Sequence, residues 1–182
     1  AETFMYRDFQ SRNVMLDASG CPHLIDYQGG RRGPYYYDVA SFLWQASARF
    51  SDELRSHLFF EYYEELSRLI PVPDPDVFRY YLRSFVAFRT LQVLGAYGFR
   101  GFFERKQHFV DSIPPALDNL RGLIADGFFA PYPHLEETLQ RVVKAFVEQQ
   151  PAESKFHPAS EQQPFAPDAC QKLMVTVWSF SY

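Results

Sequence analysis

The chain has 182 residues, which is enough for one domain with a hydrophobic core and too few for two complete domains of ordinary size. Its formal net charge of −4 creates no broad positive field, so we expect no nucleic-acid partner for this segment. The chain lacks a signal peptide, a paired CxxC motif and any stretch near the roughly 18 apolar residues of a membrane helix, so we expect a cytoplasmic protein with no membrane contact.

The first predicted elements are two short strands, residues 13–17 and 23–25, joined by a turn at residues 18–20. Together they form a small hairpin that ends at Asp26. Residues 29–34 contain three glycines and two arginines, and glycine disfavours regular structure. This segment therefore predicts a flexible basic loop.

The rest of the chain has helical spacing of its apolar residues, and the fold class predicted is mainly α with a small β-hairpin. Ser51 is a predicted N-cap of the second helix, which prolines end from Pro71 onward. The aromatic share of 18% indicates bulky helix packing or a cleft lined with rings. We predict five helices: one beginning at Asp38, one after Ser51, and three over residues 76–97, 113–125 and 134–149.

Two segments follow the last predicted helix. Residues 150–170 are rich in Pro, Glu, Gln, Ser and Ala, which cannot bury enough apolar surface to fold alone, so we predict a linker. Residues 171–182 alternate like a strand and stop, as a truncated first strand of a following domain would. The predicted organisation is a domain over residues 1–149, the linker, and that strand.

One motif in the chain carries the residue types of phosphoryl-transfer chemistry. Asp8 and Asn13 are five positions apart, and Asp26 follows Asn13 by thirteen positions after the predicted hairpin. Phosphoryl transfer from ATP needs a carboxylate to accept the proton of the attacking hydroxyl, and oxygen ligands for Mg²⁺. A tight loop directs Asp8 and Asn13 into one cleft, and the hairpin brings Asp26 back to them. The spacing follows the kinase pattern of a catalytic Asp, an Asn and a second metal-binding Asp.

At these residues the sequence resembles the aminoglycoside phosphotransferase family, whose members share the protein-kinase fold and phosphorylate small molecules. The run from Tyr35 to Trp44, with Tyr37-Asp38 before a helix, adds to the resemblance. The resemblance implies that the chain is the C-terminal lobe of a protein-kinase-like fold. It further implies ATP and Mg²⁺ as cofactors, with Asp8 as catalytic base and with Asn13 and Asp26 as metal ligands.

Two further residues would support the catalytic loop. Asp38 is implied to brace the loop, although a plain helix N-cap explains it equally well. Tyr6 stands where the family usually has His, and we expect its aromatic ring and polar tip to replace that side chain. Arg31 and Arg32 follow the metal aspartate, where they contact either a phosphate or substrate, or only solvent.

The resemblance also implies parts that this chain does not contain. The glycine-rich loop, the strand lysine and the helix glutamate belong to the nucleotide-binding N-lobe, which would precede Tyr6 in the parent protein. Residues 1–5 are then expected to be the end of the preceding helix. The parent would be a kinase, and we expect this fragment alone to be inactive.

Two hypotheses remain for the acceptor substrate, an amino sugar or an aminoglycoside. The segment from Leu24 to Gln28, together with Asp38, resembles the bacterial sugar kinases of this family that act on N-acetylmuramate and N-acetylglucosamine. Phe85 and Phe88 then act either as sugar platforms or, more commonly for such helical spacing, as core. An aminoglycoside is instead a polycation and needs an acidic cleft, for which the helix carrying Glu61, Glu64 and Glu65 is the candidate.

Two hypotheses without kinase activity also remain. In the first, the lobe is non-catalytic and serves as an interaction module, although random mutation without selection for activity would not be expected to retain Asp8, Asn13 and Asp26 together. An RNA-linked adapter is the other reading, because residues 175–182 resemble the opening strand of the C-terminal domain of the RNase adapter family. Transfer of the γ-phosphate of ATP to a hydroxyl of a small molecule, an amino sugar above all, is the function that the sequence favours.

Overall fold

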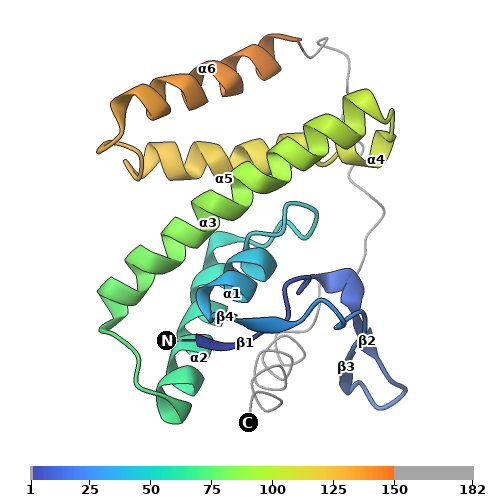
Figure 1. Ribbon diagram of the computed structural model, residues 1–182, viewed down its shortest axis with the longest axis vertical. Coiled ribbons are helices and arrows are strands. Elements are labelled where there is room, and N and C mark those ends of the chain that lie inside the picture. Colours follow the sequence, from blue (N-terminus) through green and yellow to red (C-terminus); the bar gives the residue numbers. More distant parts are fainter. Residues whose placement is uncertain (1, 150–182) are drawn as a thin grey trace. The chain divides into compact units, whose positions relative to one another are not determined.

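The computed structural model describes residues 2–149, and they divide into two compact units with the boundary between Val93 and Leu94. The described residues are mainly helical, with two small antiparallel sheets (Figure 1). Within these residues no helix is long and apolar enough to cross a membrane. The predicted linker and the predicted last strand, residues 150–170 and 171–182, lie outside the described residues.

Among the described residues, the first unit holds the four strands and the first three α-helices. The strands are β1 (Glu2–Met5), β2 (Val14–Leu16), β3 (Pro22–Leu24) and β4 (Arg31–Pro34), with a 3-10 turn η1 (Ser11–Asn13) before β2. The helices are α1 (Tyr36–Leu43), α2 (Asp52–Leu69) and α3 (Pro75–Gly98), of which the last continues into the second unit. The predicted hairpin is confirmed, since β2 pairs with β3 in register from Val14 with Leu24 to Leu16 with Pro22.

The second sheet, β1 with β4, was not predicted, and it corrects two expectations. Residues 2–5 are a strand and not the end of a helix, and residues 31–34 are its antiparallel partner and not a loop. Close approach explains the glycines here. A Cβ on Gly30 would lie 2.5 Å from the ring of Phe4, and one on Gly33 would lie 2.9 Å from the side chain of Met5.

The predicted helices are confirmed within a residue or two at most ends. The Ser51 hydroxyl caps α2 by accepting the Leu54 N–H at 3.2 Å, a contact worth about 1 kcal/mol. The first helix begins two residues before Asp38 and its N-cap is Tyr35, so Asp38 is not a helix N-cap. That carboxylate is therefore available for contacts outside its own helix.

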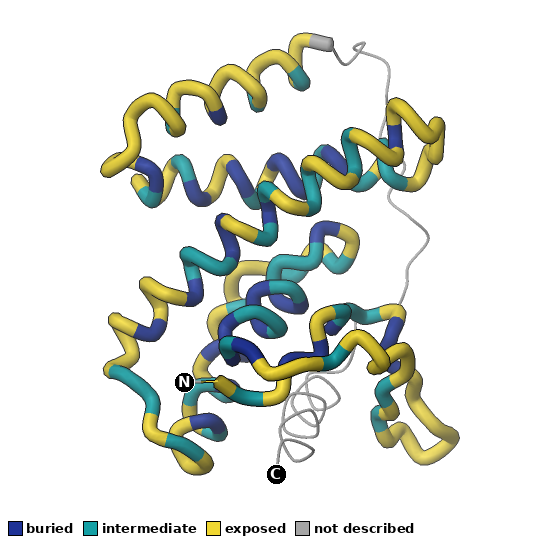
Figure 2. The backbone as a smooth tube through the Cα atoms, in the orientation of Figure 1, coloured by how far each residue is buried: buried dark blue, intermediate teal, exposed yellow. Residues whose placement is uncertain are grey.

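The core of the first unit is aromatic, as the composition predicted. Phe78 of α3 is fully buried, and it packs against rings from α1, its N-cap and α2: Tyr35, Tyr36, Phe59, Tyr62 and Tyr63. The Tyr62 hydroxyl also donates to the Tyr35 carbonyl at 2.9 Å. These contacts fix α1 against α2 and α3 and so set the position of Asp38. Figure 2 shows α1 as buried and half-buried chain along its length.

The second unit contains a π-helical turn η2 (Phe99–Phe103) and the helices α4 (Gln107–Val110), α5 (Ile113–Ala125) and α6 (Pro133–Gln149). Sequence patterns predicted α5 and α6 but neither η2 nor α4. Gly101 explains the close packing of η2, because a Cβ there would lie 2.8 Å from Val110. The N-cap position of α5 is Ser112, whose hydroxyl donates to the His108 carbonyl and does not cap the helix.

Candidate active site

The loop from Tyr6 to Asn13 is anchored by two rings on either side of Asp8. Tyr6 and Phe9 are each 2% exposed, and Phe9 stacks on Phe42 of α1 with ring centroids 4.6 Å apart. Asp8 between them is only half buried. Aromatic anchors of this kind hold a short loop against the core while one side chain stays accessible.

Asp8 and Asn13 are in direct contact, as the spacing of the motif predicted. Asn13 Nδ2 donates to the Asp8 carbonyl at 2.9 Å and to Asp8 Oδ2 at 3.1 Å, and Gln10 Nε2 donates to Asp8 Oδ1. Asn13 is buried, and its own carbonyl accepts the Ile25 N–H at 3.1 Å. The loop and the end of the hairpin are therefore joined through Asn13.

Asp26 follows the hairpin in an unusual backbone conformation. Its φ of 67° lies in the left-handed region, which is costly for a residue with a side chain and is retained where the surroundings impose it. The Tyr6 hydroxyl donates to the carbonyl of Ile25, the residue before Asp26. Gln28 Nε2 donates to Asp26 Oδ1. The Tyr6–Asn13 loop thus holds the residue before Asp26, and Gln28 orients the exposed Asp26 carboxylate.

Asp38 accepts two backbone hydrogen bonds from the loop that carries Asp8. Its Oδ2 lies 2.6 Å from the Tyr6 nitrogen, and its Oδ1 lies 2.8 Å from the nitrogen of Arg7, whose φ is 76°. Burial raises the pKa of the Asp38 carboxyl to about 6, while these N–H bonds and the charge of Arg89 act in the opposite direction. The carboxylate therefore fixes the strained backbone immediately before Asp8.

The Tyr6 phenol lies where several negative charges act on it. Burial raises the pKa of the phenol, and the charges of three aspartates raise it further: Asp26, Asp8 and Asp38. A phenol kept protonated is a hydrogen-bond donor, which is the role it has toward the Ile25 carbonyl. Tyr6 thus links the loop to the hairpin.

Arg31 and Arg32 are on β4, in register with Met5 and Phe4 of β1. Both are exposed, and Arg32 Nη2 lies 3.7 Å from a carboxylate oxygen of Glu2. Within residues 2–149 neither arginine forms a hydrogen bond or ion pair with Asp8. Sequence reasoning missed Arg7, whose Nη1 lies 3.4 Å from the Gly29 carbonyl, although it stands beside Asp8 in the motif.

The donors present suit a magnesium ion. Among residues 2–149 there is no group of three or more His, Cys, Asp or Glu side chains arranged for a metal. Mg²⁺ commonly takes only one or two protein oxygens and completes its shell with water and phosphate oxygens. Because Asn13 Nδ2 donates to Asp8, the Asn13 amide oxygen is the atom that would remain for a cation, and Asp26 would supply a carboxylate.

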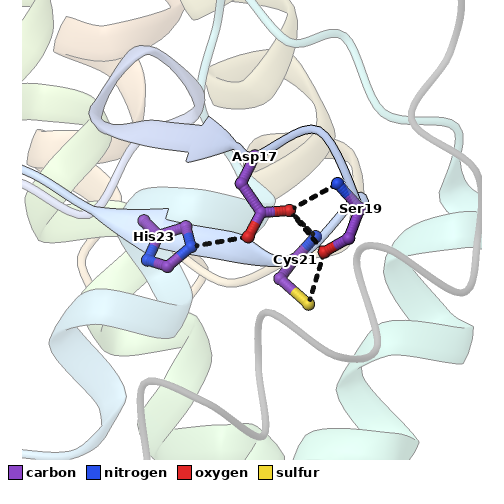
Figure 3. Close-up of polar contacts among 4 residues, drawn as sticks. All are labelled: Asp17, Ser19, Cys21 and His23. Carbon is purple, nitrogen blue, oxygen red and sulfur yellow. Dashed lines mark hydrogen bonds and ion pairs between the residues drawn. The ribbon is translucent and has the colours of Figure 1, made fainter.

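A second polar cluster lies at the turn of the β2–β3 hairpin (Figure 3). The Asp17 carboxylate accepts the Ser19 hydroxyl at 2.7 Å and the Cys21 N–H at 2.9 Å, and it lies 3.0 Å from His23 Nε2. Hydrogen bonds from Ser19, His23 and Cys21 hold the pKa of Asp17 well below its usual range. The four residues are exposed and within six positions of one another, so they stabilise the turn.

Comparison with known proteins agrees with the motif. Residues 1–80 match the model of the phosphotransferase enzyme family, APH, so the resemblance predicted from the motif is confirmed for this segment. The chain is also similar to a protein named N-acetylmuramate/N-acetylglucosamine kinase from Neisseria meningitidis serogroup B, with 31% identity over 123 residues. That match covers 66% of this chain and 36% of the relative. No solved structure matches the chain.

Proposed function

We propose that this chain, whose residues 1–80 carry a phosphotransferase enzyme family domain, is the catalytic part of an ATP-dependent kinase that phosphorylates a hydroxyl of an amino sugar. The corresponding fold is the C-terminal lobe of a protein-kinase-like protein, and the expected compartment is the cytoplasm. The observation that carries the proposal is the pair of hydrogen bonds from Tyr6 and Arg7 to Asp38, which fixes the backbone before Asp8.

In the proposed reaction Asp8 accepts the proton of the attacking sugar hydroxyl. Its carboxylate is half exposed and oriented by Asn13 and Gln10, so it needs little rearrangement to meet a substrate. Asn13 and Asp26 would hold Mg²⁺, which supplies positive charge against the phosphate oxygens. Positioning by these residues is the main contribution that a kinase makes to phosphoryl transfer.

The amino sugar is preferred to an aminoglycoside on two grounds. The relative described above carries the name of an amino-sugar kinase. The acidic helix that a polycation would need is partly neutralised, since Arg68 pairs with Glu64 at 3.8 Å and also with Glu65. Glu61 belongs to the same helix and is half buried. An aminoglycoside acceptor is therefore the second candidate.

Phe85 and Phe88, the two aromatic residues considered for stacking on a sugar ring, differ in their packing and exposure. Phe85 stacks on Tyr36 with ring centroids 5.5 Å apart, so it belongs to the packing of α3 on α1. Phe88, expected in the core, is 56% exposed, so that expectation is wrong. The proposal does not depend on either residue.

The test is a phosphorylation panel with the full-length parent protein, Mg²⁺ and ATP. The acceptors are N-acetylmuramate, N-acetylglucosamine and kanamycin, each at low and high salt. We expect phosphorylation of an N-acetylated sugar that hardly responds to salt, because the reacting hydroxyl is uncharged. Binding of a polycation would weaken with salt, since exposed charges are screened over about 8 Å at physiological ionic strength. Turnover of kanamycin alone, lost at high salt, would reverse the substrate assignment.

A further inference from the structure

Arg89 of α3 contacts α1 beside the aspartate that braces the catalytic loop. Its Nη1 donates to the Tyr37 hydroxyl at 2.7 Å and to Gln92 Oε1 at 2.5 Å. The guanidinium carbon lies 4.7 Å from the centroid of the Tyr37 ring, within the range of a cation–π contact. Arg89 thus holds Tyr37 both through its hydroxyl and through its ring.

The position of this guanidinium is not explained by its own hydrogen bonds alone. Arg89 Nε is buried and has no hydrogen-bond partner among the described residues, which is an unfavourable arrangement for a donor. Asp38 directly follows Tyr37, and the positive charge of Arg89 acts on its carboxyl group in favour of the ionised form. The attraction to Asp38 is favourable and opposes the cost of burying Nε, while the rest of the half-buried Arg89 side chain reaches Tyr37 and Gln92.

The contacts form a continuous path from α3 to the catalytic loop. Arg89 fixes Tyr37, the next residue Asp38 holds the N–H groups of Tyr6 and Arg7, and the following residue is Asp8. An ionised carboxylate accepts the N–H groups of Tyr6 and Arg7 more strongly than a protonated carboxyl group does. A nearby cation favours the ionised form of Asp38 and so strengthens these two hydrogen bonds. Each step of the path lies within the first unit.

We infer that Arg89 is a positioning residue for phosphoryl transfer: by holding Tyr37 and attracting Asp38, it fixes the Tyr6–Asp8 backbone. The expected effect on kcat rests on the proposed function. The claim that Arg89 holds the Tyr6–Asp8 backbone rests on the contacts alone. Arg89 touches neither the substrate nor ATP in this scheme. Its loss should therefore lower kcat and leave substrate binding in place.

A matched control exists on the same helix. Arg79 also makes cation–π contacts, with Phe59 and Phe60 of α2 at 5.1 Å and 5.5 Å, and within residues 2–149 it forms no hydrogen bond or ion pair with α1 or the Tyr6–Asn13 loop. Replacing either arginine with Met removes a charge and a cation–π contact from α3. Only the replacement of Arg89 should affect Asp38.

The kinetic experiment uses the full-length parent protein with Arg89→Met, Arg89→Lys and Arg79→Met. We expect Arg89→Met to lower kcat about 3-fold to 30-fold, with KM for ATP and for the acceptor changed by less than about twofold. Arg89→Lys should recover part of kcat because it keeps the charge, and Arg79→Met should behave like the wild type. In an Asp38→Asn background the effect of Arg89→Met should shrink to less than about twofold.

The second experiment measures amide hydrogen exchange in the same proteins and does not need activity. The N–H groups of Tyr6 and Arg7 should exchange at least about threefold faster in Arg89→Met than in Arg79→Met, while the amides of α2 keep their wild-type rates. If the wild type phosphorylates no acceptor, the proposed function fails, and this measurement still decides whether Arg89 holds the loop. If Arg89→Met does not fold, Arg89→Lys is compared with Arg79→Met in the same way.

Three results would overturn the inference. The first is unchanged exchange at Tyr6 and Arg7. The second is a wild-type kcat for Arg89→Met in an active parent protein. The third is a uniform rise of exchange across the fold with kcat and KM affected together, which would make Arg89 a residue of general stability.

Discussion

Two polar clusters of the first unit, around Asp8 and around Asp17, each surround an aspartate with hydrogen-bond donors, but they differ in where those donors come from. The Asp8 loop is held by Asp38 through bonds that join residues 32 and 31 positions apart, and by Tyr6 to Ile25 across 19 positions. The bonds to Asp17 join residues two, four and six positions apart. The first cluster depends on the fold, and the second needs only a turn.

Burial separates the two clusters in the same way. Tyr6 and Asn13 support the first cluster from the core, whereas Asp17 and His23 at the hairpin turn have 41% and 62% of their side chains exposed. Figure 2 shows this turn as exposed chain. Long-range contacts carry a larger entropic cost of loop closure than local contacts. A cluster that is held by long-range contacts and still leaves a carboxylate accessible is therefore the better candidate for a site.

Substitution of Asp8 is expected to have the largest effect. Asp8→Asn keeps the size of the side chain and removes the proton acceptor, so kcat of the full-length parent should fall roughly 10²-fold or more. KM for ATP should stay near the wild-type value, since the change affects the transition state more than ground-state binding. Steady-state kinetics with a coupled ADP assay measures both. Near wild-type turnover would remove Asp8 from the mechanism.

Substitution of Asp26 should act on the metal. Asp26→Ala removes a carboxylate oxygen, and the Mg²⁺ concentration for half-maximal rate should rise about tenfold. A magnesium titration of the parent protein at saturating ATP measures this shift. Asp17→Ala is the matched control, because it removes an aspartate from the other end of the same hairpin. An equal magnesium requirement in the two variants would contradict the assignment of Asp26.

The two clusters should also respond to pH with opposite signs. Asp38 has a pKa raised from 3.8 to about 6 in the folded state, so the folded protein binds more protons between these values and the contribution of Asp38 to stability falls as pH rises. The pKa of Asp17 is lowered, so its contribution is present above 3.8 and is lost as pH falls.

Urea unfolding of the parent protein between about pH 2.5 and pH 7 tests this difference, because the contribution of Asp17 is lost below 3.8 and that of Asp38 is lost above 3.8. Relative to the wild type, Asp38→Asn should become less destabilising as pH rises, and Asp17→Asn should become more destabilising. If the loss of unfolding free energy caused by each substitution changed with pH in the same direction, burial would not control the ionisation of Asp38. The effect is the smallest of the three, because Asp17 is exposed to solvent.

The sequence predicted the parts of the fold that depend on local patterns. Periodic apolar residues and the Ser51 cap predicted α2, and the same reasoning predicted α3, α5 and α6. It did not predict the pairing of β1 with β4, because the Tyr6–Asn13 loop and the β2–β3 hairpin lie between those strands and each strand is only four residues long. Strand pairing over such a separation depends on tertiary contacts that local propensity does not contain.

The candidate site shows the same division. The spacing of Asp8, Asn13 and Asp26 predicted residues that the structure brings to one loop and hairpin, with Asn13 in contact with Asp8. The roles of these residues stay predictions. Arg89 was missed because nothing in its local sequence shows that α3 passes Tyr37, 52 positions earlier in the chain.

The claim that phosphate transfer depends on Asp8 is tested most directly by phosphorus NMR of three parallel reactions of the full-length parent protein. The wild type, Asp8→Asn and Asp17→Asn are incubated at equal concentration with Mg²⁺, ATP and N-acetylated amino sugar. We predict a sugar-phosphate signal that grows at rates within about twofold of each other for the wild type and Asp17→Asn, and no such signal for Asp8→Asn over the same time. Equal product from Asp8→Asn, or loss of product in Asp17→Asn, would contradict the assignment of the catalytic centre.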